Sequence, residues 1–195
     1  MTVDEDGVFP DGLRLSPMPL GFDPGAFDCG ESDLTAYLCD GDACRDEAVG
    51  FARTYLVYGG DDSIGYVSVM ADAIRLEAKE RPDGVEYSSA PALKLGRMGL
   101  DKSHHGRGIG IWMLDMVVGM ARTMGAKAGL RYVTLDALND GLVAWYSDYG
   151  FVRNHGEANR QIALLKSFGS WKKDSRLHRT SMRFDIQLEE EAQAC

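Results

Sequence analysis

The sequence predicts an α/β (α+β) fold in which a central twisted mixed sheet of about six to seven strands is flanked by helices. Two patterns carry this prediction. Phe51 to Tyr58 alternates and is rich in β-formers, Gly59 to Asp62 supplies turn residues, and Ile64 to Leu76 reads as the partner strand of a hairpin. Further along, a strand, a glycine-rich loop and an apolar segment with helical periodicity follow one another between Ala92 and Met124.

Length and composition are those of a globular protein with one core. The chain has 195 residues, of which 45% are hydrophobic and 26% charged. We expect a flexible acidic leader over residues 1–12, a single domain over 13–188 and an acidic tail over 189–195. No window holds about 18 consecutive apolar residues, and Asp4 to Asp6 is acidic where a signal peptide is basic. The sequence therefore predicts a cytoplasmic protein that does not contact a membrane.

The first half of the chain is predicted element by element. A strand is expected over Leu13 to Pro17, before a helix whose start is capped at Ser32 and Asp33, is interrupted at Gly41 and ends near Ala48. After the hairpin, Glu77 to Pro91 reads as a loop.

The second half begins with a strand over Ala92 to Asp101, in which Gly96 and Gly99 indicate a bulge or a close backbone approach. A helix over Ile111 to Met124 follows the glycine loop. The remaining segments are predicted as a strand over Arg131 to Ala137, a helix over Asn139 to Tyr149 ending at Gly150, a strand over Phe151 to Arg153 and a last alternating strand over Ser181 to Leu188.

The glycine loop is the first candidate for a binding site. Gly106, Gly108 and Gly110 separate a strand from a helix, and such a loop offers free backbone N–H groups and the positive end of a helix dipole to a pyrophosphate. The spacing matches neither GxxxxGK[ST] nor GxGxxG, so ATP and NAD are poor candidates. An ordinary turn is the alternative.

Cysteine and histidine spacing does not predict a metal site. The four cysteines are irregularly spaced and the four histidines form no HExxH pattern. We expect reduced thiols and no metal.

Charge is distributed unevenly along the chain. Residues 1–50 carry 12 acidic residues against 2 basic ones, a net of −10, whereas residues 153–184 carry 8 basic against 2 acidic ones, a net of +6. The total of −9 argues against a general nucleic-acid coat. The basic segment can still attract phosphate at short range, and a solvated loop is the alternative.

Three blocks resemble the GNAT superfamily of acetyl-CoA-dependent N-acetyltransferases, over about Phe27 to Leu188. Leu95 to Asp101 (LGRMGLD) is similar to the family's bulged strand. His105 to Gly110 (HGRGIG) is similar to its [Q/R]xxGx[G/A] pyrophosphate loop, with His105 where Gln or Arg is usual. Asn139 to Phe151 looks like its NxxAxxxY...GF ending, shifted in the small residue.

The resemblance implies a GNAT fold with acetyl-CoA as cofactor and coenzyme A as product. It implies main-chain bonds from Met98 and Leu100 to the pantetheine arm. The cofactor-binding residues that it implies are Met98, Gly99, Leu100, His105, Gly106, Arg107, Gly108, Ile109, Gly110 and Asn139. It assigns catalysis to Tyr146, whose alternative role is that of a core aromatic residue.

A narrower resemblance is to the tRNA-acetylating toxins of bacterial toxin-antitoxin pairs. Phe27 to Gly30 followed by Ser32, Leu34 and Leu38 is similar to their FxCGxxxLxxxL opening, and Ala52 to Tyr55 to their first hairpin strand. This implies aminoacyl-tRNA as substrate, an antitoxin as partner and a homodimer, for which the strand over Ser181 to Leu188, if exposed, offers a pairing edge. The residues expected to contact tRNA phosphates are Lys172, Lys173, Arg176 and Arg179.

Acetyl transfer requires a neutral amine, a polarised thioester carbonyl and an acid for the leaving thiolate. A tyrosine hydroxyl, with a reference pKa near 10, is protonated at neutral pH and can donate to the sulfur. No Glu or His lies in the strand block to act as an evident base, and His104 and Glu86 are the candidates that folding would have to bring near. An α-amine, with a reference pKa of about 7.7 to 8.0, needs little help from a base. Two alternatives stay open: an enzyme for small amines or protein lysines, and a non-catalytic acetyl-CoA-binding module.

Overall fold

The computed structural model describes residues 12–155 and 179–187, and all structural statements below concern these residues. Its strands are β1 (Leu13–Pro17), β2 (Arg53–Gly59), β3 (Asp62–Arg75), β4 (Ser89–Leu100), β5 (Tyr132–Ala137), β6 (Val152–Arg153) and β7 (Thr180–Asp185). Its helices are α1 (Ser32–Cys39), α2 (Asp42–Ala48), α3 (Ile109–Ala128) and α4 (Asp140–Tyr149), with short 3-10 turns η1 (Ala78–Glu80) and η2 (Lys102–His104).

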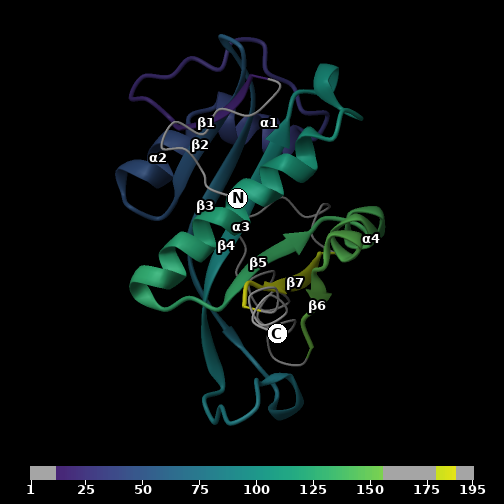
Figure 1. Ribbon diagram of the computed structural model, residues 1–195. Coiled ribbons are helices and arrows are strands. Elements are labelled where there is room, and N and C mark those ends of the chain that lie inside the picture. The colour runs from purple at the N-terminus through teal and green to yellow at the C-terminus, as the bar shows by residue number, and fades with distance from the viewer. Residues whose placement is uncertain (1–11, 156–178, 188–195) are drawn as a thin grey trace, which may run out of the picture. The chain divides into compact units, whose positions relative to one another are not determined.

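The strands are hydrogen-bonded in the order β1-β2-β3-β4-β5-β7-β6. The pairs β1/β2, β2/β3, β5/β7 and β6/β7 are antiparallel, whereas helix α3 connects β4 to its neighbour β5, as a parallel crossover requires (Figure 1). The predicted α/β (α+β) class with a mixed sheet flanked by helices is confirmed.

The chain divides into two compact units, which we describe one at a time. Unit 1 comprises the chain up to Met70 together with Leu95–Val117, and unit 2 comprises Ala71–Lys94 together with the chain from Val118 onward. The expectation of a single domain over residues 13–188 stays a prediction.

In unit 1, helices α1 and α2 cover one face of the β2–β3 hairpin. Their shared core consists of Met18, Phe27, Cys29, Tyr37, Leu38, Ala43, Leu56 and Tyr66. The predicted break at Gly41 is present, since Gly41 has φ 80° and separates the two helices. The predicted side-chain cap is wrong: the N-cap position is Glu31, without a side-chain cap bond. The helix already starts at the Glu31 carbonyl, which accepts from the Thr35 N–H, so Ser32 lies inside the first turn.

Strand β4 contains the predicted bulge. The Asp101 N–H bonds to the Ile64 carbonyl, and the Leu76 N–H bonds to the Ser88 carbonyl. Between these bonds β4 advances 13 positions while β3 advances 12, so β4 holds one extra residue. A Cβ at Gly96 would lie 2.5 Å from Met70, and one at Gly99 2.7 Å from Tyr66, two residues on the same face of β3. Positions three apart share a face only where alternation is broken, which places the bulge between Gly96 and Gly99.

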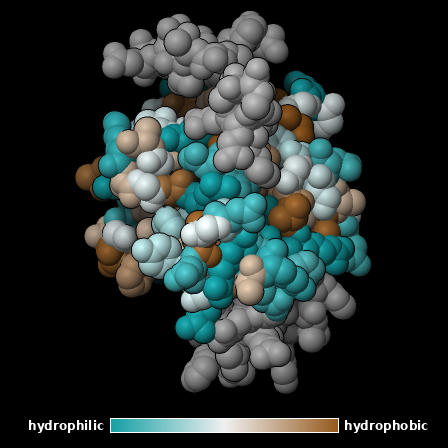
Figure 2. All heavy atoms as spheres, turned by 60° about the horizontal axis from the view of Figure 1, so that its bottom comes forward, coloured by the Kyte–Doolittle hydropathy of each residue, from teal (hydrophilic) through white to brown (hydrophobic). Residues whose placement is uncertain are grey.

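Helix α3 extends further than predicted at both ends, over Ile109–Ala128. By length and composition it is the one helix in the described part of the chain that could cross a membrane. Its fully or nearly fully buried residues recur at helical spacing, as in the core helix of a globular protein: Met113, Leu114, Val117, Val118 and Ala121. The face drawn in Figure 2 shows hydrophobic residues as separate spots among hydrophilic ones, which is ordinary for a surface in water.

In unit 2, strand β7 lies between β5 and β6. Arg183 is opposite Thr134 of β5 and also opposite Val152 of β6. The expectation that Ser181 to Leu188 forms an exposed strand free to pair across a two-fold axis is therefore wrong, because β7 pairs with β5 along its whole length and also with β6 at Met182 and Arg183. The sequence could not reveal this, since the partners are set by the order of strands in space.

A buried ion pair connects η1 to β7 in unit 2. The Arg183 guanidinium donates to Glu80 Oε1 at 2.8 Å and to Asn154 Oδ1 at 2.7 Å, and the side chains of Arg183 and Glu80 are only 12% and 5% exposed. Burial alone would raise the pKa of the Glu80 carboxyl. The Glu77 N–H and Arg183 outweigh burial, so the pKa is lowered.

Replacing one partner of this pair should destabilise the fold strongly. We expect Arg183→Met to lower the free energy of unfolding by about 3 to 5 kcal/mol, because an uncompensated carboxylate stays buried. The double variant Glu80→Leu/Arg183→Met should recover most of the loss. The wild-type advantage should be present above the pH at which a free carboxyl titrates and should disappear as pH falls through the lowered pKa of Glu80. Urea unfolding from pH 7 to pH 3 measures both effects, and equal stability of single and double variants would contradict the prediction.

Candidate functional site

The predicted pyrophosphate loop lies in unit 1 between β4 and α3. Gly106 and Gly108 have φ values of 74° and 78°, in the left-handed region that favours glycine. The N–H groups of Ile111 and Trp112 both bond to the Gly108 carbonyl, so the helix begins there. The N–H groups of Ile109 and Gly110 precede the first intrahelical bond and are available to a ligand. The geometry is that of an anion-binding helix start.

The two larger polar side chains of the loop stabilise its main chain. His105 Nε2 lies 2.8 Å from the Leu100 carbonyl oxygen, which can only accept, so Nε2 carries a proton. The Arg107 guanidinium donates to the Ser103 carbonyl at 3.1 Å. His105, where the family has Gln or Arg, thus ties the loop to the end of β4. Its predicted cofactor contact, like that of Arg107, stays a prediction.

Met98, Gly99 and Leu100 form the end of β4 beside this loop. A side chain at Gly99 would overlap the Tyr66 ring, whose hydroxyl donates to the Leu34 carbonyl at 2.7 Å. Packing therefore explains glycine at this position. Main-chain bonding to a cofactor by Met98 and Leu100 is a separate matter and stays a prediction.

A polar cluster that sequence reasoning missed lies on the α1–α2 side of β4. The buried Tyr37 hydroxyl is 3.1 Å from both Asp46 Oδ2 and Ser68 Oγ, and the Arg97 guanidinium lies 3.8 Å above the Tyr37 ring. Burial is the main cause that raises the pKa of Tyr37. Arg97 comes from the bulged part of β4, so the cluster holds that segment against α1 and α2.

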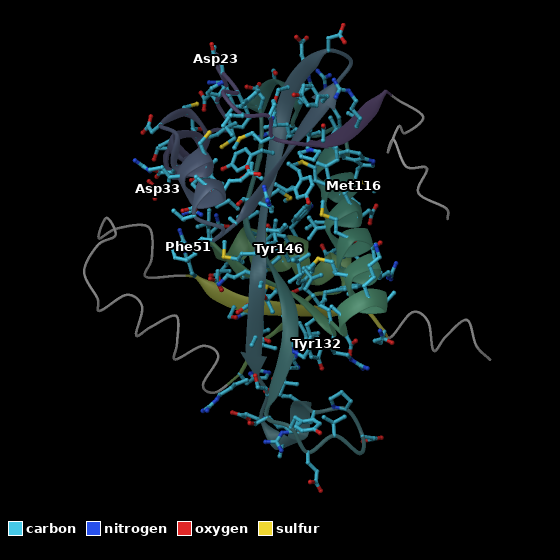
Figure 3. The ribbon with its side chains drawn as sticks, turned by 90° about the vertical axis from the view of Figure 1, so that its left-hand side faces the viewer. Asp23, Asp33, Phe51, Met116, Tyr132 and Tyr146 are labelled. Atoms are coloured by element: carbon cyan, nitrogen blue, oxygen red, sulfur yellow. The ribbon has the colours of Figure 1, made fainter. Side chains whose placement is uncertain are left out.

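Tyr146 lies on α4 in unit 2 (Figure 3). It is 8% exposed, and its ring contacts Trp145 and Phe151 edge-on, at centroid distances of 4.9 and 5.6 Å. Burial raises its pKa to about 12. Among the described residues its hydroxyl has no hydrogen-bond partner.

Asn139 has a structural role that is visible directly. Its Oδ1 accepts from the Leu142 N–H at 2.9 Å, so its side chain is the N-cap of α4. The helix ends as predicted at Gly150, which has φ 116°. The predicted contact of Asn139 with the cofactor stays a prediction.

The other candidates are dispersed or lie outside the described residues. Lys172, Lys173 and Arg176 fall in the segment 156–178, outside the described chain. Arg179 immediately precedes β7 and is partly exposed. His104 lies in η2 of unit 1, and Glu86 is exposed in the segment after η1 of unit 2. Within residues 12–155 and 179–187, no group of three His, Cys, Asp or Glu side chains could hold a metal ion.

Comparisons with known proteins find acetyltransferase toxins among the relatives of this chain. No family model matches the chain. A curated tRNA-acetylating toxin of Mycobacterium tuberculosis is 27% identical over 150 residues, which is 74% of this chain and 87% of the toxin. The chain has the GNAT fold of the acetyltransferase toxins. The predicted resemblance to the tRNA-acetylating toxins is thereby confirmed.

Two solved toxin structures extend the likeness over nearly the whole chain. AtaT complexed with acetyl-methionyl-tRNAfMet has a TM-score of 0.74 at 19% identity, over 94% of this chain and 99% of AtaT. A tyrosine-to-phenylalanine mutant of AtaT, bound to the C-terminus of the antitoxin AtaR and acetyl-CoA, has a TM-score of 0.69 at 19% identity, over 94% and 99% of the two chains.

Removing the α4 cap should weaken the helix that carries Tyr146. We expect Asn139→Ala to lower the free energy of unfolding by about 1 kcal/mol and Asn139→Asp to retain stability, because aspartate also accepts from the Leu142 N–H. Thermal and urea unfolding provide the measurement. If Asn139→Ala were as stable as the wild type while binding coenzyme A less well, the residue would act on the cofactor rather than as a cap.

Proposed function

We propose that the chain is an acetyl-CoA-dependent N-acetyltransferase that acetylates the amino group of aminoacyl-tRNA and so inhibits translation. The observation that carries the proposal is the 74% of the chain that aligns with a tRNA-acetylating toxin. The toxin AtaT, with the same fold, has been solved with acetylated tRNA and with acetyl-CoA and antitoxin. We infer that this chain acts in the cytoplasm, as a homodimer, with a cognate antitoxin as partner.

The residues of unit 1 fit acetyl-CoA. Left-handed Gly106 and Gly108 expose the main chain, and the start of α3 offers amides to the pyrophosphate. Met98 and Leu100 would pair with the pantetheine arm, and a main-chain N–H near them would polarise the thioester carbonyl. Acetyl-CoA itself supplies an activated acetyl group on sulfur.

In the reaction, the amine nitrogen forms a bond to the acetyl carbon while the carbon–sulfur bond breaks, and one proton moves from nitrogen to sulfur. We assign Tyr146 to the departing sulfur. Its pKa of about 12 lies above the reference pKa of a thiol, about 8.5. Tyr146 is therefore the weaker acid, and it stabilises the thiolate by donating a hydrogen bond while the proton of the amine neutralises the sulfur.

The α-amino group is a suitable acceptor because it is partly neutral at pH 7 and needs no strong base. We propose that Lys172, Lys173, Arg176 and Arg179 contact the tRNA phosphates. Such contacts make activity fall steeply with salt concentration.

One observation favours a second acceptor class, a small cationic amine or a protein lysine. Exposed acidic residues lie before, on and directly after α1: Asp23 and Asp33, which Figure 3 labels, and Asp40 at the C-cap. This surface attracts cations. Weak salt dependence, together with acetylation of polyamines or proteins in preference to charged tRNA, would identify this alternative. The non-catalytic module would bind acetyl-CoA without transferring the acetyl group.

Removing the Tyr146 hydroxyl should abolish most of the activity. We expect Tyr146→Phe to reduce acetylation of charged tRNA by about 10²- to 10³-fold, because the sulfur loses its hydrogen-bond donor while the ring packing is kept. Labelled acetyl-CoA would be incubated with charged total tRNA and with a pool of proteins and polyamines. Tyr149→Phe is the matched control, since it removes a hydroxyl from the same helix and the same aromatic cluster. Equal loss in both variants would refute the assigned role.

The pH profile should report the acceptor and not Tyr146. Initial rates at saturating acetyl-CoA should rise as the α-amine loses its proton, around pH 7.7 to 8.0. They should stay level up to pH 9.5, because a tyrosine with a pKa of about 12 remains protonated there. A falling limb between pH 8 and 9.5 that is absent from Tyr146→Phe would contradict this.

A further inference from the structure

The carboxylate of Asp101 joins two segments of unit 1 that are far apart in sequence. Oδ1 accepts from the Ser103 N–H at 3.0 Å and from the Ser103 hydroxyl at 2.5 Å, and Oδ2 accepts from the Asp28 N–H at 3.1 Å. Its own N–H bonds to the Ile64 carbonyl at 2.8 Å. One side chain therefore fixes the turn after β4 to the turn at Asp28.

In a second set of bonds between the same two segments, the donors lie in the turn after β4 and the acceptor is Asp28. The Lys102 N–H donates to the Asp28 carbonyl at 2.9 Å, and the Lys102 ammonium lies 2.5 Å from Asp28 Oδ2. Since the Ser103 hydroxyl donates to Asp101, it must accept from His104 Nδ1, which is 2.9 Å away. The His104 N–H bonds in turn to the Asp101 carbonyl at 2.9 Å. These bonds determine the direction in which the chain enters His105 to Gly110.

Electrostatics alone does not favour an acid here. A carboxylate four residues before His105 and five before Gly106 repels an anion bound at the loop. Asp28 is neutralised by Lys102, whereas the hydrogen bonds of Asp101 all come from uncharged groups. An acid at this position can favour anion binding only if its hydrogen bonds help to shape the loop more than its negative charge repels the anion.

We propose that Asp101 is a positioning residue that holds the main chain of the loop from His105 to Gly110 in the shape that binds coenzyme A; this inference rests on the proposed function. Hydrogen bonding, first from the Ser103 hydroxyl and then from the Ser103 N–H, lowers the pKa of Asp101. The carboxylate is thus ionised, and accepts all three bonds, throughout the neutral pH range.

The test uses the fact that the charge of Asp101 weakens anion binding at the loop, whereas its hydrogen bonds are proposed to strengthen it. Asp101→Asn removes a negative charge, which by itself favours anion binding, but an amide has one accepting oxygen in place of two and its NH₂ faces donors. We expect the Kd for coenzyme A, measured by titration calorimetry, to rise about tenfold. Asp61→Asn, an exposed acid in the β2–β3 turn of the same unit, is the matched charge control and should leave Kd unchanged or slightly lower.

Kinetics separate positioning from general damage. In Asp101→Asn the KM for acetyl-CoA should rise with Kd, while kcat at saturating acetyl-CoA and the KM for the acceptor stay within about twofold. Ser103→Ala removes the hydroxyl's bonds to Asp101 and His104 but keeps the carboxylate and the two main-chain N–H bonds that it accepts, so it should give an intermediate Kd even if Asp101→Asn folds poorly. An unchanged or lower Kd in both variants, or a fall in kcat without a change in KM, would overturn the proposal.

The same titration distinguishes this inference from the proposed function. Wild-type protein that binds coenzyme A but acetylates no acceptor would refute the proposed function and leave the role of Asp101 to be decided by the Kd values. Wild-type protein that does not bind coenzyme A would overturn both.

Discussion

The candidate site depends on one constraint: the main chain between β4 and α3 must keep amide groups unpaired and still hold one shape. An open amide is costly inside a protein unless a ligand or water satisfies it, and residues 105–108 of the loop lie on the surface. The loop is therefore held in one conformation by side-chain hydrogen bonds and not by bonds between its own amides. Two left-handed glycines make the turn possible, and the side chains of His105, Arg107 and Asp101 supply the bonds that fix it.

Tyr146 is subject to a different compromise. Its ring is buried among Trp145 and Phe151, which gives it a fixed direction, and the same burial raises its pKa to about 12. A phenol in this environment keeps its proton throughout the neutral pH range and is therefore present as a hydrogen-bond donor. Aromatic packing and catalytic suitability are therefore not competing explanations for this residue, because the packing produces the property that the proposed chemistry uses.

Local signals made most of the fold predictable. The β2–β3 hairpin, the interruption at Gly41 and the end of α4 at Gly150 each follow from a few neighbouring residues with strong conformational preferences. The turn between β4 and α3 was predictable for the same reason, because the closely spaced glycines Gly106 and Gly108 indicate it. The bulge in β4 was signalled by two glycines, although only the register against β3 locates it.

What escaped prediction depends on contacts between distant segments. Asp28 and Asp101 are 73 positions apart, and nothing near either residue indicates the other. The pair of Glu80 and Arg183, 103 positions apart, is similar. The position of β7 inside the sheet was missed because the alternation of apolar and polar residues is the same in an edge strand and in a central strand. The N-cap was missed by one residue, which is within the usual uncertainty of helix ends.

The place of β7 in the strand order has a consequence for synthesis of the chain. β5 and β6 both pair with β7 (Thr180–Asp185), so neither has this partner until residues 180–185 have left the ribosome. A nascent chain that ends before residue 180 presents two unpaired strand edges and the aromatic residues that Phe184 covers. Unit 2 can be completed only after residues 180–185 have been synthesised, so for a protein proposed to stop translation, the folded form appears only some time after β5 and β6 have been made.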